Sequence, residues 1–475
     1  MRRFGLALLA AWSVLGWTLL AGFGSAGDAR AEPKFRVVLG AVAADSAAAP
    51  TSNAQGVRYC QYLPGTSQPA TMPPEVINPP APPPSPAPTV PGQTAVPAAT
   101  TQRQVRVFDA IKDTVSKTYV YPDYNGKDWP AITARYLELV SGGLTDTDFA
   151  KAMSAMIAEL GDQHSQYMSP QEVADEQARQ AAGEHFVGIG IVGVRVGTSK
   201  TGTIVAVFPN SPAADAGLRP HDLLIEVDGL TYLDDAGSAR SRGPAGTSFS
   251  LKFQRPGEAA QTIMIQRRAV GGFTPVDYCI VPNTRIGYIM LPTFADTNVD
   301  DQVRAALKKL TADGPLSGLV LDNRMNSGGR SDVTLPILGF FTSGGLGKMM
   351  SRTSPTDVST TPEDIGGSQR VPLVILTGPD TVSYGEIFSG VLQQSGRAKT
   401  VGGPTDGNVE VLAGTNFEDG SRLWLATYAF APVGLKAGAW EGVGVVPDVS
   451  VPTRWDLFTE ATDPALAQAV ALLQK

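Results

Sequence analysis

The chain has 475 residues, of which 43% are hydrophobic and 17% charged, so it can bury the cores of about three domains. Its formal net charge is −7, which leaves no basic footprint and excludes nucleic acid as an expected partner. Three histidines and two cysteines without clustered spacing give no metal-site signature, and we expect no metal and no cofactor.

The N-terminus has the pattern of an export signal. Arg2 and Arg3 precede an uncharged apolar run over residues 4–23, and Ala29-Arg30-Ala31 offers an A-x-A cleavage site. Residues 1–31 are therefore expected to be a signal peptide. The apolar run is also long enough to span a bilayer, so an uncleaved inner-membrane anchor is the alternative. Both readings predict a bacterial periplasmic or other extracytoplasmic location.

The next two segments differ in composition. Residues 32–63 are Ala- and Ser-rich around one strand-like run at 35–39, and they suggest no function. Residues 64–102 are rich in Pro, Ala, Thr and Ser and predict an extended, disordered linker. Cys60 and Cys279 are the only cysteines, and we hypothesise a bond between them because an exported protein meets an oxidising compartment.

Residues 103–184 read as a helical region. One apolar face is formed there by Val105, Phe108, Ile111 and Val115. From residue 285 onward, apolar β-branched runs alternate with helical patterns, and the segments are RIGYIML, VDDQVRAALKKL, GLVLDNR, SDVTLPILGFF, VPLVILTG and SYGEIFSGVLQQ. Such alternation predicts an α/β layer around a largely parallel sheet.

The segment from Val371 to Gly403 is typical of a nucleophile position. Residues 371–377 predict a buried strand, 378–380 break it, and a helix begins near Ser383. A hydroxyl on the first helical turn sits among unpaired backbone N–H groups and the positive end of the helix dipole, which stabilise a developing oxyanion. The alternative is that Ser383 only caps the helix.

A second glycine-containing turn follows the strand at 318–322. The polar turn over residues 323–329 ends in Gly328 and Gly329, where backbone can approach a ligand closely. Its N–H groups could form half of an oxyanion hole.

Several ordered motifs together resemble the C-terminal processing peptidases, serine peptidases of the tail-specific and tricorn type. These motifs are GDQHSQYMSP (161–170), a PDZ-like stretch from Phe186 to about Arg268, LVLDNRMNSGGRSD (319–332), VSYGEIFSG (382–390) and GVGVVPDVSV (442–451). The resemblance implies an α/β crotonase-like catalytic core over 271–475, an inserted PDZ-like β-rich domain over 185–270 and an N-terminal helical region. It also implies Ser383 as nucleophile, with Tyr384 N–H and a glycine of the Gly328-Gly329 pair as oxyanion donors.

One departure from the family pattern bears on mechanism. Tail-specific members use a Ser/Lys dyad, but Asn408 stands in the lysine's place and Leu412 in that of a following glutamine. An asparagine amide has no useful basicity, so the usual dyad cannot form. Tricorn-like members instead use a histidine and a glutamate, which His164 and Glu441 match, so we expect a Ser383–His164–Glu441 triad.

Other bases stay open as alternatives. His185 and His221 have no identifiable carboxylate partner and read as surface or loop residues. A displaced lysine, Lys399 or Lys436, is a further alternative to the histidine.

The PDZ-like stretch suggests how a substrate is held. Backbone N–H groups around Gly188, Ile189, Gly190 and Ile191 are expected to bind a terminal carboxylate while the peptide adds as a strand. The alternative is a purely regulatory or structural lid.

These patterns lead to one function and one rival. We expect an exported serine endopeptidase that cleaves polypeptides with exposed C-terminal tails through an acyl-enzyme. The rival is a catalytically inactive peptide-binding pseudopeptidase that acts as a scaffold or regulator. The sequence predicts no oligomeric state.

Overall fold

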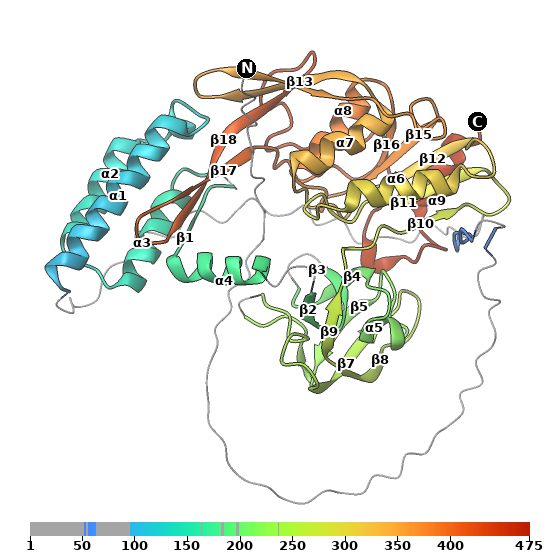
Figure 1. Cartoon of the computed structure of the whole chain (residues 1–475), viewed down its shortest axis with the longest axis horizontal. Helices are drawn as coiled ribbons and strands as arrows, with labels where there is room; N and C mark the ends of the chain where they lie inside the picture. Colours follow the sequence, from blue (N-terminus) through green and yellow to red (C-terminus); the bar gives the residue numbers. More distant parts are fainter. Residues whose placement is uncertain are drawn as a thin grey trace, which may run out of the picture.

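The computed structural model describes residues 52–53, 56–62, 96–162, 164–181, 185–195, 199–235 and 237–475. The expected leader, the strand-like run at 35–39 and most of the expected linker lie outside these residues. Figure 1 shows three parts in the rest of the chain: the helices at the N-terminal side, a β-rich unit and a larger α/β part that carries the C-terminus.

The N-terminal part is helical, as expected. Its elements are α1 (Ala98–Thr118), the 3-10 turn η1 (Tyr124–Gly126), α2 (Trp129–Ser141), α3 (Asp146–Ala158) and α4 (Pro170–Ala181). The expected boundary at 102/103 is wrong, because α1 already begins at Ala98 after Pro97. Phe108, Ile111 and Val115 of the predicted apolar face are fully buried.

The α/β part is built on a six-stranded sheet in the spatial order β10-β11-β12-β15-β16-β19. Its strands are β10 (Tyr278–Ile280), β11 (Ile286–Met290), β12 (Gly318–Asp322), β15 (Leu373–Thr377), β16 (Lys399–Gly402) and β19 (Val449–Ser450). Only β10 runs antiparallel to its neighbour. The expected strand and helix alternation is confirmed.

Helices cover both faces of this sheet. They are α6 (Val299–Leu310), α7 (Ser331–Phe341), α8 (Tyr384–Gln394) and α9 (Pro464–Leu473), with the 3-10 turn η2 (Trp455–Leu457) before α9. Because side chains alternate along a strand, Leu319 and Leu321 of β12 pack with α6, α7 and α8, whereas Val320 packs with α9. The carboxyl ends of β12 and β15 therefore lead directly into the two turns singled out in the sequence.

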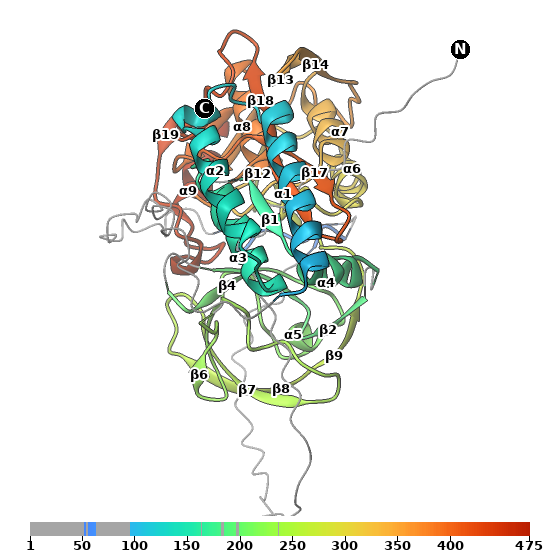
Figure 2. The same cartoon turned by 90° about the vertical axis from the view of Figure 1, so that its left-hand side faces the viewer.

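A second sheet joins the helical region to the α/β part. It contains β1 (Gln166–Met168), β13 (Gly344–Ser351), β14 (Pro355–Thr360), β17 (Val411–Asn416) and β18 (Arg422–Pro432). Side chains of β17 and β18 share a core with α1, α2 and α3. Figure 2 shows α1 and α2 lying over these strands. Because β1 belongs to this sheet, the loop that precedes β1 lies close to the start of α8.

The β-rich unit has a two-stranded and a six-stranded sheet. Its elements are β2 (His185–Gly188), β3 (Ile191–Arg195), β4 (Gly202–Val207), α5 (Pro212–Asp215), β5 (Leu223–Val227), β6 (Leu230–Thr231), β7 (Ser248–Gln254), β8 (Gln261–Gln266) and β9 (Arg268–Gly271). A separate hydrophobic core lies inside it, centred on Phe249, Leu251 and Leu224. It is thus a distinct folded unit between α4 and β10.

His221 connects this unit to the α/β part. It lies in a turn, as expected, but not at the surface, because its side chain is buried and stacks on Trp455 with ring centroids 3.7 Å apart. His221 Nδ1 lies 2.8 Å from the Trp455 carbonyl oxygen, and the Trp455 indole N–H donates to the Ile204 carbonyl oxygen. Burial lowers the pKa of His221, which keeps the docked imidazole neutral.

The hypothesised bond between Cys60 and Cys279 is present. It fastens the segment 56–62 to β10, where Tyr59 also bridges Ile280 and Arg58 pairs with Asp277. Among the described residues, no helix combines the length and apolar character needed to cross a membrane.

Candidate active site

Ser383 sits at the sharp turn between β15 and α8. It occupies the N-cap position with φ +55° and ψ −124°, a backbone conformation that is rare for a residue with a side chain. Its N–H donates to the Asn408 carbonyl oxygen at 2.9 Å and to Glu386 Oε2 at 3.0 Å. Ser383 is therefore both the cap and a residue held in a strained turn at the end of a parallel strand.

Glu386 holds this turn against the loop after β16. Besides Ser383 N–H, its carboxylate accepts Thr405 Oγ1–H at 2.6 Å and the N–H groups of Gly407 and Asn408 at 2.7 and 2.8 Å. Burial raises the pKa of Glu386 to about 7, while Thr405, Gly407 and Asn408 oppose that rise. The side chain thus fixes the relative position of Ser383 and the loop that carries Asn408.

Two unpaired backbone donors face Ser383. Gly329 and Tyr384 line the same small pocket as Ser383, and within the described residues their N–H groups have no hydrogen-bond acceptor. The Gly328 N–H is used elsewhere, since it donates to Asn326 Oδ1 at 3.0 Å. Gly328 nevertheless adjoins the pocket, because a Cβ there would stand 3.0 Å from Tyr384 N.

His164 is positioned by Asp162 in the loop between α3 and β1. Asp162 Oδ1 accepts the N–H groups of His164 and Ser165 at 3.0 and 2.6 Å, and Tyr119 O–H donates to its other oxygen at 2.7 Å. Ser165 Oγ in turn accepts the N–H of Ala426 in β18. These bonds fix the loop to the second sheet and turn the buried imidazole toward the start of α8.

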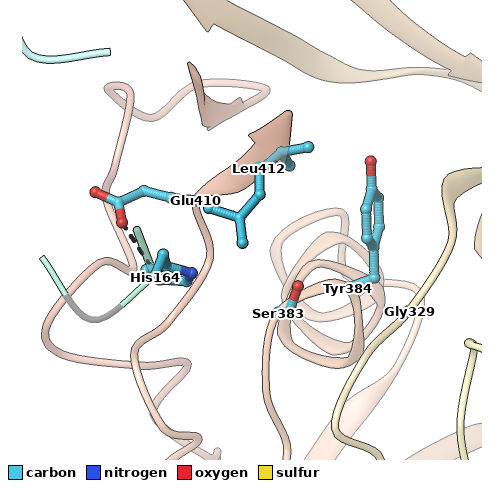
Figure 3. Close-up of a pocket in the computed structure, with 7 residues that line it drawn as sticks. His164, Gly329, Ser383, Tyr384, Glu410 and Leu412 are labelled. Carbon is cyan, nitrogen blue, oxygen red and sulfur yellow. Dashed lines mark ion pairs between the residues drawn. The ribbon is translucent and has the colours of Figure 1, made fainter. Parts of the chain in front are cut away.

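Two carboxylates face the imidazole. Its Nε2 lies 3.3 Å from Glu410 Oε2 and 3.6 Å from Glu441 Oε1. Glu441 was expected here, but Glu410 and its partner Tyr121, whose O–H donates to Glu410 Oε1, were missed. The sequence did hold a signal for Glu410, which is a carboxylate two positions after the Asn408 that replaces the lysine. Figure 3 shows the His164 ring between Glu410 and Ser383.

The loops that carry these carboxylates pack backbone against backbone. A Cβ on Gly407 would lie 2.8 Å from Val443 N, and one on Gly444 would lie 2.2 Å from the Thr405 carbonyl oxygen. Gly407 and Gly444 are therefore required by the close approach of the two loops, which brings Glu441 and Glu410 to the same imidazole.

His164, Ser383, Glu410 and Leu412 line one pocket. In the described part of the chain no hydrogen bond joins the side chains of Ser383 and His164, although both line that pocket. Asn408 supports the backbone of Ser383 and supplies no base.

His164 and Glu410 both have pKa values above those of the isolated side chains. Burial opposes protonation of His164, but Glu441, Glu410 and Asp162 outweigh it, so the pKa of His164 is raised. Burial, and after it the charge of Glu441, raises the pKa of Glu410 to about 7, although His164 and Tyr121 oppose this. Both directions follow from two carboxylates placed around one buried imidazole.

The alternative bases lie elsewhere. Lys399 is exposed and pairs with Asp448, and Lys436 is exposed. His221 is buried against Trp455 at the docking contact. The side chain of His185 lies outside the described atoms. Of the candidate bases that the structure describes, only His164 lines the pocket of Ser383.

The expected carboxylate-binding loop lies between β2 and β3. Gly190 has φ +78°, and Phe208 N–H donates to its carbonyl oxygen. The N–H groups of Ile189 and Gly190 donate to no acceptor within the described residues. Ile191 begins β3, which pairs with β4 on one side only.

Comparison with known proteins places this geometry in a family. Residues 285–451 match the model of peptidase family S41, and residues 104–158 match that of the tricorn protease C1 domain. The chain thus contains a peptidase S41 domain over residues 285–451. It is a serine-type peptidase, and Ser383, the two glycines and His164 all lie in or beside the matched regions.

Named relatives agree with this assignment. The chain is 27% identical over 390 residues to the carboxyl-terminal-processing protease of Synechocystis sp., covering 80% of this chain and 88% of that protein. It is 28% identical over 345 residues to the carboxy-terminal processing protease CtpB of Bacillus subtilis, covering 71% and 67%. A solved structure of the photosystem II D1 C-terminal processing protease has a similar fold, with a TM-score of 0.54, 22% identity and coverage of 77% and 99%.

Proposed function

We propose that this S41 peptidase is an exported endopeptidase that cleaves polypeptides through an acyl-enzyme on Ser383. The α/β part is then its crotonase-like catalytic core, and the β-rich unit is an inserted PDZ-like domain that binds the substrate's C-terminal tail. One observation carries the proposal: Ser383, His164 and the unpaired N–H groups of Gly329 and Tyr384 line a single pocket.

The chemistry follows from these positions. Ser383 Oγ attacks the scissile carbonyl carbon while His164 takes the hydroxyl proton, and the carbonyl oxygen becomes an oxyanion held by Gly329 and Tyr384 N–H. His164 then gives its proton to the leaving amine as the C–N bond breaks. A water molecule repeats the sequence on the ester and releases the acid, with Ser383 restored.

The position of the carboxylates decides which nitrogen acts as the base. Since His164 Nε2 faces Glu410 and Glu441, the neutral ring carries its proton on Nε2 and keeps the lone pair on Nδ1. The imidazolium formed during attack is stabilised by the same two carboxylates. Glu441 thus keeps its expected role, and Glu410 shares it.

Catalysis also needs a closure. Ser383 and His164 come from different parts of the fold and are not in hydrogen-bond contact. A small displacement of the His164 loop toward α8 completes the triad. The β-rich unit follows α4, which itself follows β1 and His164, so docking of a tail on that unit triggers the displacement.

Tail recognition is supported by the loop between β2 and β3. Its unpaired Ile189 and Gly190 N–H groups can donate hydrogen bonds to a terminal carboxylate, and the free edge of β3 can pair with an extended peptide. Phe186 and Val187 are 38% and 41% exposed and offer apolar contacts for the last side chains.

The test is cleavage of peptides that differ only at the C-terminus. Full-length protein is incubated with an apolar-tailed peptide and its C-terminal amide, and the products are identified by mass spectrometry. Cleavage of the free acid that Ser383→Ala abolishes, with weaker cleavage of the amide, is expected. Peptide binding without cleavage, unchanged in Ser383→Ala, would instead identify the inactive peptide-binding protein.

A further inference from the structure

The spacing around His164 Nε2 is wrong for simple charged hydrogen bonds. Such bonds measure about 2.7–2.9 Å between nitrogen and oxygen. Here the nearest oxygens of Glu410 and Glu441 lie 3.3 and 3.6 Å away. Two ligand atoms that each lie about 2.0–2.1 Å from a tetrahedral zinc ion are roughly 3.3–3.4 Å apart. The three ligand atoms also lie within 4.8 Å of one another.

Each carboxylate is held by its other oxygen. Tyr121 O–H donates to Glu410 Oε1, and Val409 N–H donates to Glu441 Oε2 at 2.9 Å. Glu410 Oε2 and Glu441 Oε1 are thereby turned toward His164 Nε2. Outer hydrogen bonds of this kind orient carboxylates in metal sites.

The inner atoms lack other partners. The His164 side chain is 3% exposed and that of Glu410 2%, and neither Nε2 nor Oε2 has a hydrogen-bond partner in the described structure. Glu441 is 21% exposed, which leaves an entry path. Buried polar atoms without partners are costly, and a bound cation would satisfy both.

We propose that His164 Nε2, Glu410 and Glu441 form a zinc site that reversibly inhibits the peptidase. A neutral imidazole and two carboxylates balance the charge of Zn²⁺, and one position stays open for water, as in other sites with three protein ligands. Cadmium and cobalt(II) fit the same donors, whereas Mg²⁺ and Ca²⁺ require more oxygen ligands.

Bound zinc would inhibit the peptidase because it determines which nitrogen of the His164 ring carries the proton. When Nε2 binds the ion, the neutral imidazole carries its only proton on Nδ1. No lone pair then remains to accept the Ser383 proton. This consequence rests on the proposed triad, whereas metal binding itself does not.

Binding is measured first, by isothermal titration of the full-length, metal-free chain with Zn²⁺. One high-affinity ion per chain is expected, with no comparable signal from Mg²⁺. Glu410→Gln and Glu441→Gln should each weaken Zn²⁺ binding on the order of 100-fold or more, and Tyr121→Phe about 10- to 100-fold, as outer-shell changes do. Glu418→Gln, on the exposed pair with Arg106, is the matched control and should bind as the wild type does.

An absorption spectrum of the wild type with Co²⁺ tests the metal site without relying on variants that could fail to fold. Co²⁺ should give the intense visible absorption of a tetrahedral nitrogen and oxygen site, and Zn²⁺ should displace it. Absence of this absorption together with absence of zinc binding would overturn the proposal. So would zinc binding that survives in both glutamine variants.

A third measurement separates this inference from the proposed function. Zn²⁺ should slow labelling of Ser383 by a fluorophosphonate at least 10-fold, and EDTA should restore it. If Ser383 never labels but one zinc binds through Glu410 and Glu441, the catalytic proposal fails and the metal site stands. If Ser383 labels and zinc neither binds nor inhibits, the metal site fails alone.

Discussion

His164 Nε2 lies closer to Glu410, at 3.3 Å, than to Glu441, at 3.6 Å. Glu441, the carboxylate expected from the sequence, is therefore one of two, and the nearer one, Glu410, stands two positions after Asn408. The loop that carries Asn408 therefore supplies a carboxylate that faces the histidine. The histidine and the two carboxylates that face it thus come from different segments of the chain.

The two carboxylates should set the pH dependence of Ser383 reactivity. His164 must be neutral to take a proton, and its pKa is raised, so reactivity should fall as the pH drops through a value above the ordinary 6.5. Glu410→Gln removes a charge that raises this pKa, so the acid limb should move to lower pH. The rate of fluorophosphonate labelling between pH 5 and 9 measures both curves. An acid limb that stays in place in Glu410→Gln would show that Glu410 does not act on the base.

Gly328→Ala should block the oxyanion pocket. The added methyl group would stand 2.7 Å from Ser383 Cβ and 3.0 Å from Tyr384 N, at a backbone φ of +87°. Labelling should fall about 10²- to 10³-fold, the usual effect of losing an oxyanion donor. Gly434→Ala is the control, because φ is +80° there and no atom lies within 4 Å of the added carbon. Equal losses in both variants would trace the effect to backbone strain alone.

Glu386→Gln should loosen the turn that holds Ser383. The amide nitrogen would face backbone donors that now point at a carboxylate oxygen, which leaves them unsatisfied. We expect a loss of roughly 1–3 kcal/mol in the free energy of unfolding, measured by urea denaturation, together with slower labelling of Ser383. Glu418→Gln on the surface should change neither. Wild-type stability in Glu386→Gln would contradict the positioning role.

The bond between Cys60 and Cys279 should stabilise the whole catalytic part. It closes a loop of 219 residues in sequence separation, and removal of a native disulfide typically costs about 2–5 kcal/mol. The double variant Cys60→Ala/Cys279→Ala should therefore unfold at lower urea concentration than the wild type. Thiol titration of the purified protein with and without reductant provides the direct check, and two free thiols without reductant would contradict the bond.

Local patterns predicted the elements that hold the nucleophile. The expected helix over 331–341 is α7, and the strand expected over 371–377 is β15, from Leu373 to Thr377. Both have a continuous apolar pattern with a clear stop, so short-range periodicity was enough to define them. Ser383 occupies the N-cap position of α8 with a positive φ, and its role as nucleophile stays a prediction.

The sequence pattern did not predict which distant segments pack against one another. The pairing of β18 with β1 and β13 joins segments far apart in the sequence, and so does the contact between Tyr121 and Glu410. His221 showed no local sign of burial, because its partner Trp455 lies in another part of the fold. Sequence periodicity therefore did not predict the contacts between separate folded units.

The central claim is that His164 activates Ser383, with Glu441 orienting the imidazole. Full-length wild type is labelled with a fluorophosphonate probe beside Ser383→Ala, His164→Ala and Glu441→Gln, with and without an apolar-tailed peptide to promote closure. Labelling that disappears in Ser383→Ala and falls strongly in the His164 and Glu441 variants is the predicted result. Labelling that needs Ser383 but is unchanged in His164→Ala, or no labelling of the wild type under either condition, would contradict the account.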